Sequence, residues 1–228
     1  MSPQGPLRRL AVLATLSITA SVLPVVSLPV GRGSAVSHRA LELRGPGVVQ
    51  APIAFGLVGL SWPRGELSPA GVRVRTSEDG VRWSGWSELD SDEVDLGPDR
   101  GAEASEVRST TPLWVGRAKF VDVRAAGRLP RGTRLHMIDP GPDPKGPASS
   151  AAASPSQPGI ITRSQWGADE SIRKCCPAYA PTLKAVIIHH TATGNSYGPG
   201  DSAAIVRSIY AYHVQSNGWD DIGYNFLV

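Results

Sequence analysis

The stretch VRVRTSEDGVRW, residues 72–83, decides the fold of the first half of the chain. Apolar and polar residues alternate on both sides of the Asp79-Gly80 turn signal, which is typical of a β-hairpin. Two further runs alternate in the same way, AKFVDVR at 118–124 and RLHMID at 134–139, and glycine or proline separates the runs. The sequence therefore predicts a β-rich domain over residues 36–139, and a small antiparallel sandwich is its simplest architecture.

Four tryptophans fall within this β-rich stretch, namely Trp62, Trp83, Trp86 and Trp114. They could line a carbohydrate platform, but aromatic side chains in a small β domain more often pack in its core or at its edges, and we favour that interpretation. The pattern predicts a fold for this domain and assigns it no role.

A change of composition divides the chain after this domain. Residues 140–159, PGPDPKGPASSAAASPSQPG, contain proline, glycine, serine and alanine without apolar periodicity, which predicts a linker. The pattern then becomes α/β. The aliphatic residues at 186–188 predict a buried strand over 185–190, and DIGYNFLV at 221–228 predicts a second strand paired with the first.

A helix is predicted between these two strands. Asp201 is a suitable N-cap, and apolar residues recur at helical spacing through SAAIVRSIYAYHVQSN. Asn217-Gly218 ends the helix. His213 falls on its apolar face, and we interpret it as a core residue.

Two histidines follow the first predicted strand, in VIIHHTATGN at 186–195. The end of a strand is where open α/β folds place their chemistry, and imidazole is the commonest metal ligand and a proton carrier near neutral pH. The alternative is an ordinary pair, with one histidine buried and hydrogen-bonded and the other solvated. From this stretch alone we favour the ordinary pair, because a lone histidine pair has no specified partner.

The N-terminus predicts export. Arg8 and Arg9 precede a long uncharged stretch, and GSA at 33–35 offers small residues for a signal peptidase, so residues 1–35 are predicted to be a secretory signal. The stretch is also long enough for a membrane anchor, but Pro24 and Pro29 interrupt it. We expect cleavage, no stable membrane span afterwards, and a secreted or cell-envelope protein.

Charge argues against a nucleic-acid partner. The formal net charge is +3, and the predicted signal carries three arginines and no acidic residue, so the remainder balances at zero. No run of sequence combines basic residues with interleaved aromatic residues, as a nucleic-acid-binding stretch would.

The only two cysteines in the chain, Cys175 and Cys176, are adjacent. Ordinary disulfide geometry is hard to reach between neighbours, which leaves a strained bridge, free thiols or an intermolecular bond. Their spacing does not suit a metal site.

Three blocks in order, ITRSQWGA, VIIHHTAT and IYAYHVQSNGWDDIGYNFLV, resemble the zinc-dependent N-acetylmuramoyl-L-alanine amidases that share a fold with the peptidoglycan recognition proteins. The resemblance covers residues 160–228 and implies the first half of an α/β amidase domain with a mixed sheet and helices. The implied cofactor is zinc, and the implied partner is peptidoglycan or a muramyl peptide. The implied reaction is hydrolysis of the amide between the lactyl group of N-acetylmuramic acid and L-alanine.

The resemblance also implies roles for individual residues. His189 corresponds to a zinc ligand, His190 and Thr191 to the substrate-binding floor of the cleft, and Tyr224 to a catalytic residue that acts at the metal-bound water. His213 corresponds to a packing position.

The sequence departs from the family pattern at its end. Family members take a second histidine and a cysteine or carboxylate from the second half of the domain, and this sequence stops at Val228. A catalytic zinc site needs about three protein ligands. We therefore expect a truncated and inactive version of an amidase. The alternatives are a non-catalytic peptidoglycan-binding module, or a cell-wall adhesin in which the β domain does the binding.

Overall fold

The computed structural model describes residues 35–91, 106–144, 159–176, 181–182, 186, 188, 191 and 193–228. The predicted signal, apart from Ala35, and most of the predicted linker lie outside them. The described residues all belong to one compact unit, Gly31–Val228. None of the helices in these described ranges is both long enough and apolar enough to cross a membrane.

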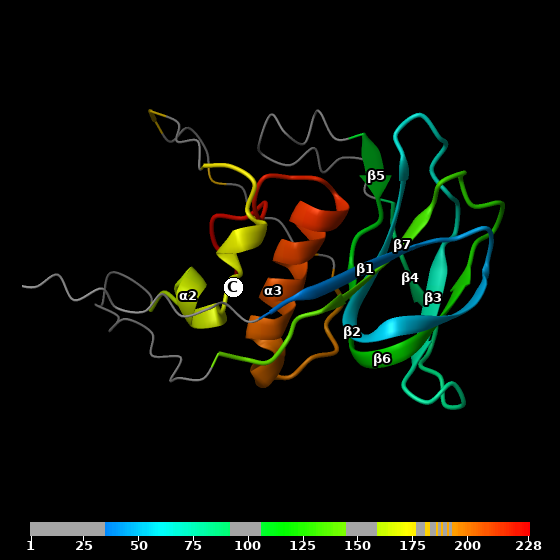
Figure 1. Ribbon diagram of the computed structural model, residues 1–228, viewed down its shortest axis with the longest axis horizontal. Coiled ribbons are helices and arrows are strands. Elements are labelled where there is room, and N and C mark those ends of the chain that lie inside the picture. Colours follow the sequence, from blue (N-terminus) through cyan, green and yellow to red (C-terminus); the bar gives the residue numbers. More distant parts are fainter. Residues whose placement is uncertain are drawn as a thin grey trace, which may run out of the picture. The chain divides into compact units, whose positions relative to one another are not determined.

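Seven antiparallel strands form the β domain (Figure 1). The strands run in the order β1-β7-β2-β6-β3-β4 within one sheet, and β5 pairs with β2. The predicted antiparallel β-rich domain is thus confirmed. Its strands form one continuous sheet and not the two separate sheets of the predicted sandwich. The bounds are β1 Ser37–Glu42, β2 Gly47–Pro63, β3 Arg73–Ser77, β4 Ser87–Glu88, β5 Val107–Ser109, β6 Leu113–Arg124 and β7 Arg134–Asp139.

Strand β2 holds the sheet together. It is 17 residues long, pairs with β6 from Gly47 to Val58, and pairs with β7 from Leu57 to Ser61. Register shifts interrupt the β2–β6 pairing on either side of Phe55, and such bulges bend a strand. The bent sheet encloses one core, to which β2, β3, β6 and β7 all contribute buried side chains: Phe55, Val58, Leu60, Val72, Val74, Ala118, Val121, Val123, Leu135 and Met137.

The hairpin predicted at 72–83 forms with a longer loop than expected. Val72, directly before β3, and Val74 and Thr76 on β3 are buried, in the predicted alternation. The returning strand begins at Ser87 rather than at Val81, because the chain first makes a turn. In that turn the Asp79 carboxylate accepts hydrogen bonds from the backbone N–H groups of Val81 and Arg82.

The helix predicted after Asp201, through SAAIVRSIYAYHVQSN, is confirmed. Helix α3 spans Ser202–Ala211 and continues as the π-helical turn η3, Tyr212–Ser216. Gly218, with a φ of 85°, follows directly after Asn217, as expected for a helix end. The shorter helices are α2 Arg163–Trp166, η1 Glu170–Ile172 and η2 Pro199–Asp201.

The two strands predicted in this segment are wrong for the residues described. Val186 and Ile188 are 79% and 97% exposed and have no strand conformation, and residues 221–228 form no strand. His189 and His190 themselves lie outside the described residues. A strand is stable only when its backbone pairs with a neighbour, and no strand is found between residues 159 and 228 among those described. The predicted α/β domain is therefore not confirmed.

Helix α3 packs on the β domain instead. Ile205, Ile209 and Tyr212 share a core with Leu57 of β2 and Ile138 of β7. These two strand residues alternate with the residues that point into the main core, so α3 covers the outer side of the sheet there (Figure 1).

Candidate functional site

An ion pair joins two of the sequence blocks that carry the family resemblance. Arg163, in α2, pairs with Glu170 through a 2.6 Å contact from Nε to Oε1. Its Nη1 also lies 3.1 Å from Oδ1 of Asp221, in the GWDDIGY block. The side chains of this network are partly exposed, so the pairs contribute little to stability. The Arg163–Asp221 pair shows that the C-terminal block lies against α2.

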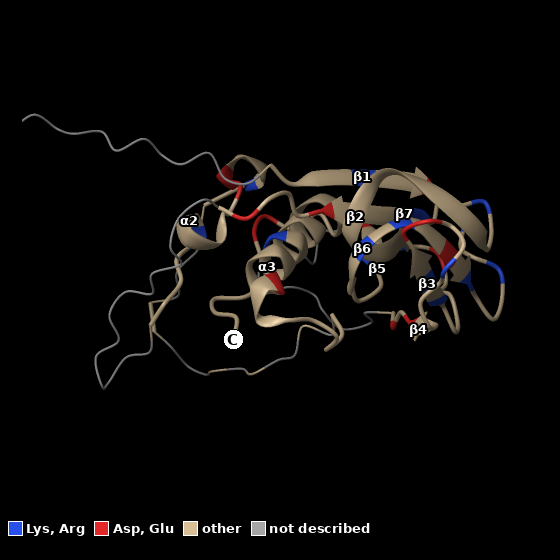
Figure 2. Ribbon diagram, turned by 90° about the horizontal axis from the view of Figure 1, so that it is seen from below, with Lys and Arg blue, Asp and Glu red and all other residues tan. Residues whose placement is uncertain are grey.

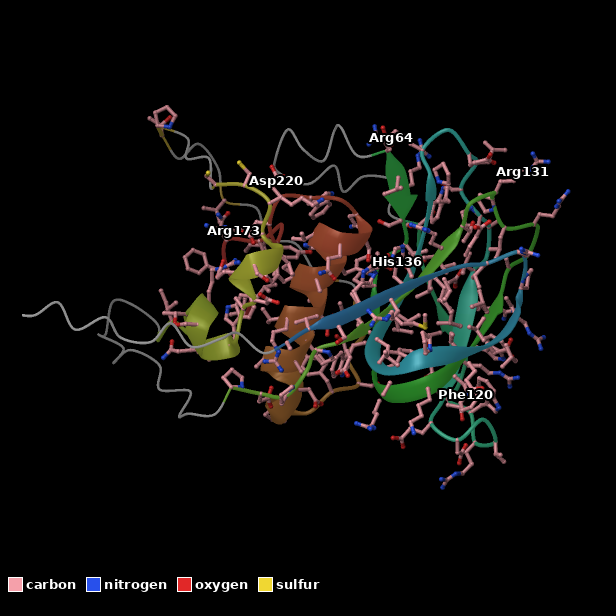
Figure 3. All side chains as sticks on the ribbon, viewed as in Figure 1. Arg64, Phe120, Arg131, His136, Arg173 and Asp220 are labelled. Carbon is pink, nitrogen blue, oxygen red and sulfur yellow. The ribbon has the colours of Figure 1, made fainter. Side chains whose placement is uncertain are left out.

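Two further contacts hold the same block. The Lys174 ammonium donates to the Gly218 carbonyl at 2.8 Å, and the Lys174 backbone N–H donates to the Asp220 carbonyl at 3.0 Å. Figure 3 shows the labelled Arg173 and Asp220 on the same side of the molecule. The segment after η1 is thereby tied to the chain that follows α3.

His213 lies at the centre of an aromatic cluster within this block. Its ring is 4.3 Å from that of Trp219 and 5.7 Å from that of Tyr224, between centroids. The Gly223 backbone N–H donates to His213 Nδ1 at 3.1 Å. His213 is 5% exposed, and desolvation lowers its pKa to about 3, so the imidazole is neutral at pH 7. Its interpretation as a core residue is confirmed.

The local sequence explains how this cluster forms. Gly218 adopts a left-handed conformation that reverses the chain after η3, and the Trp219 backbone N–H then donates to the His213 carbonyl at 3.0 Å. A Cβ on Gly223 would lie 2.6 Å from Cζ3 of Trp219, so only glycine fits beside this indole.

The predicted site residues fall in different places. His189 and His190 lie outside the described residues. Thr191 is partly buried, and its Oγ1 lies 3.0 Å from that of Thr193, whose carbonyl accepts the Trp114 N–H of β6. Tyr224 is partly buried beside His213. The described geometry therefore brings Tyr224 to the aromatic cluster and Thr191 to the edge of the β domain.

A zinc site remains a prediction. Within the described ranges, no three His, Cys, Asp or Glu side chains are grouped closely enough to hold a metal ion, and the predicted ligand His189 lies outside them. His213 does not fit as a replacement, because its Nδ1 already accepts a hydrogen bond and the ring is enclosed by aromatic side chains. Cys175 and Cys176 are free and exposed thiols.

Sequence reasoning missed Arg163 and Asp221 as partners. They are far apart in the chain, and charged residues at such a separation carry no spacing signal. The family blocks in which both residues lie were the only available indication that these segments belong together.

Similarity to curated proteins concerns a part of the chain. This chain is 41% identical to peptidoglycan-recognition protein LE of Drosophila melanogaster over 69 residues. The match covers 30% of this chain and 20% of that protein. The chain is 45% identical over 71 residues to peptidoglycan-recognition protein SC2 of Drosophila melanogaster, covering 36% of that protein. With peptidoglycan recognition protein 1 of Bos taurus it shares 35% identity over 69 residues, 30% of this chain and 35% of the relative.

The chain therefore spans between a fifth and about a third of the length of these relatives. No solved structure matches it significantly. A family model described as Rv3811 N-terminal galactose-binding domain-like matches residues 21–159, which include all seven strands. Since this match covers more than half of the chain, the protein belongs to the Rv3811 N-terminal galactose-binding domain-like family.

Proposed function

We propose that this protein recognises peptidoglycan at the cell envelope through residues 160–228. One observation carries the proposal, namely the 35% to 45% identity over 69 to 71 residues to proteins named for peptidoglycan recognition. Residues 160–228 contain the three blocks on which the family resemblance rests.

The geometry of the C-terminal block is consistent with a binding role. The Arg163–Asp221 ion pair connects the block to α2, and Tyr224 is partly exposed beside the aromatic cluster around His213. An aromatic ring with a hydroxyl group can stack on a sugar or donate to a peptide carbonyl. A muramyl peptide offers both kinds of group.

Amidase activity is the second candidate. It rests on the resemblance, in which His189 would hold zinc and Tyr224 would act beside it. A bound zinc ion would supply a Lewis acid for the amide carbonyl and lower the pKa of a water molecule. The Tyr224 phenol would steer that water or stabilise the developing oxyanion by donating a hydrogen bond.

The test of recognition is sedimentation of the full chain with purified insoluble peptidoglycan, with cellulose as the control polymer. We expect binding to peptidoglycan and not to cellulose. Tyr224→Phe and Thr191→Val should weaken binding, whereas Tyr197→Phe, which alters an exposed tyrosine, should not. Equal sedimentation with both polymers, or no sedimentation, contradicts the proposal.

A second assay separates recognition from hydrolysis. Release of L-alanine amino groups from a soluble muramyl peptide is measured with and without added zinc. Turnover that requires zinc and is lost in His189→Ala establishes the amidase. Binding without turnover leaves peptidoglycan recognition as the function.

We infer from the predicted signal in residues 1–35 that this function is exercised outside the cytoplasm. An N-terminal fusion of residues 1–35 to a reporter enzyme that is active only after export tests the location. Activity of the fusion, lost when Arg8, Arg9 and the following apolar stretch are deleted, is the expected result.

A further inference from the structure

The outer side of the β sheet has two parts. Over Leu57 and Ile138 it is covered by α3, as described above. The other part, formed by the start of β2, the end of β6 and β3, faces solvent, and Val48 there is 60% exposed. Basic residues lie on β3 and β6 (Figure 2).

The strand register brings these basic residues together. Val48, Asp122 and Arg75 lie directly opposite one another on β2, β6 and β3. In the next row Arg73 of β3 lies opposite Arg124 of β6. All five side chains are on the outer side, because their neighbours in sequence, among them Val74 and Val123, point into the main core. We call this surface the arginine face.

The pairing of Arg73 with Arg124 has no stabilising role in the sheet. Like charges directly opposite each other on neighbouring strands destabilise the pairing. Within the part of the chain that the structure describes, neither arginine forms an ion pair, although Glu88 lies opposite Arg73 on β4. An anion bound between the two guanidinium groups would remove the repulsion.

The third arginine is held rigidly. Arg75 donates to Oδ2 of Asp122 from Nε at 3.0 Å and from Nη2 at 2.8 Å, and the Asp122 side chain is only 6% exposed. Its guanidinium lies 4.9 Å from the Trp83 ring centroid and 4.8 Å from that of Trp86. Arg124 lies 5.0 Å from the Trp86 centroid. Guanidinium groups positioned in advance lose little conformational freedom when a ligand binds.

A hollow of about 450 Å³ adjoins these groups. Arg75, Asp122 and Arg124 form its polar side, and Pro46 and Val48 form an apolar side. A ligand that fits both sides has an apolar ring face and carries a planar anion, which a guanidinium group binds with two hydrogen bonds.

We propose that the arginine face binds a carboxylate-bearing polysaccharide, with a pyranose ring against Pro46 and Val48 and its carboxylate between Arg73 and Arg124. A polyol phosphate chain lacks ring faces for the apolar side. Nucleic acid binds to broad positive surfaces, whereas the formal charges of residues 36–228 sum to zero. This site lies on the β domain and is independent of the proposed peptidoglycan site in residues 160–228.

The test is titration calorimetry of the full chain with polygalacturonate, which contains no peptidoglycan. We expect binding that weakens as salt is raised, and no binding to uncharged dextran. Arg73→Gln with Arg124→Gln should weaken binding at least ten-fold. Val48→Asp should weaken it similarly, because a carboxylate is added at the hollow on an exposed position that does not contribute to the core.

Arg39→Gln with Arg108→Gln is the matched control. It removes two exposed arginines from β1 and β5, outside the arginine face, and should change the affinity less than two-fold. Thermal unfolding of each variant shows that it is folded. The proposal is overturned by absence of binding, by equal losses in the two double variants, or by tighter binding to polyglycerol phosphate or to single-stranded DNA than to polygalacturonate.

Discussion

His38 and His136 share a partly buried hydrogen bond, 2.9 Å between Nε2 of His38 and Nδ1 of His136, with their ring planes only 6° apart. The other nitrogen of His136 lies 2.7 Å from Oγ of Ser61. Ser216 of η3 approaches His38 at 3.5 Å. The pair, with His136 labelled in Figure 3, therefore lies where the sheet meets the π-helical end of α3.

This contact predicts that acid destabilises the fold. The pKa of His136 is lowered from 6.5 to about 3, chiefly by burial and in addition by the charges of His38 and Arg134. Burial, with Arg39, also lowers the pKa of His38. Histidines with a depressed pKa stay neutral in the folded chain while the unfolded chain takes up protons. The free energy of unfolding therefore has its full value above pH 6.5, where both states are neutral at these groups, and it decreases as the pH falls toward 3.

Urea unfolding at a series of pH values from 7.5 to 4 measures this loss. Each histidine that stays neutral should reduce the free energy of unfolding by about 1.4 kcal/mol per pH unit below its unfolded pKa. His136→Gln should lower the free energy of unfolding at pH 7.5. It should also reduce the slope of that free energy against pH by the contribution of one proton, about 1.4 kcal/mol per pH unit. An identical pH dependence in the wild type and the variant would contradict the assignment.

Gly59 is predicted to be essential for packing of α3 on β2. A Cβ at this position would lie 2.5 Å from the Tyr212 hydroxyl oxygen and 2.6 Å from Cε2, and that hydroxyl donates to the Leu60 and Thr110 carbonyls. The ring cannot move without losing these bonds. Gly59→Ala should cost about 1 to 3 kcal/mol in unfolding free energy. Gly65→Ala, which meets no atom within 4 Å, should change it by less than about 0.5 kcal/mol.

Tyr212→Ala provides the complementary measurement for the same contact. Once the ring is removed, the alanine methyl at position 59 has room, so the double variant should be no less stable than Tyr212→Ala alone. Strictly additive losses would show that Gly59 and Tyr212 do not touch.

Arg207 is predicted to be the strongest single link between α3 and the segments beside it. Its side chain is 0% exposed, and it donates to the carbonyls of Pro140 at 2.9 Å and Trp166 at 2.8 Å. Arg207→Met would leave these carbonyls without a donor and should cost about 3 kcal/mol. Asp143, its ion-pair partner, is 59% exposed, so Asp143→Asn should cost less than about 1 kcal/mol. Denaturant unfolding of both variants checks the order.

The features that the sequence predicts correctly are those set by residues close together in the chain. The helix at 202–211 and the alternation on β3 follow from periodicities of 3.6 and 2 that any short window reveals. The failure at 185–190 has a physical cause, because a short aliphatic run is compatible with a strand only when partner strands exist. Val186 and Ile188 show that β-branched residues alone do not form one.

Sites assembled by tertiary structure escaped sequence reasoning. Arg73, Arg75 and Arg124 belong to no basic run, and only the β3–β6 register turns them into one surface. Likewise, His38 and His136 are 98 residues apart and meet because of the contacts between β1 and β7. Tyr224 lies beside His213 of the same sequence block, whereas the catalytic role that the family resemblance implies for Tyr224 stays a prediction.

Gly223 controls the environment of His213. Its substitution by alanine would place a methyl group 2.6 Å from Cζ3 of Trp219 and 3.6 Å from Cε1 of His213. The indole must then move off the imidazole, which admits water to a group whose pKa is held at about 3 by desolvation. We expect the pKa of His213 in Gly223→Ala to rise toward 6.5, as followed by NMR titration of the imidazole protons. Gly200→Ala, with no atom within 4 Å of the added methyl, should leave the His213 pKa unchanged. A pKa that is the same in Gly223→Ala as in the wild type would mean that Trp219 does not shield His213, and that the cluster owes its low pKa to the packing of α3 instead.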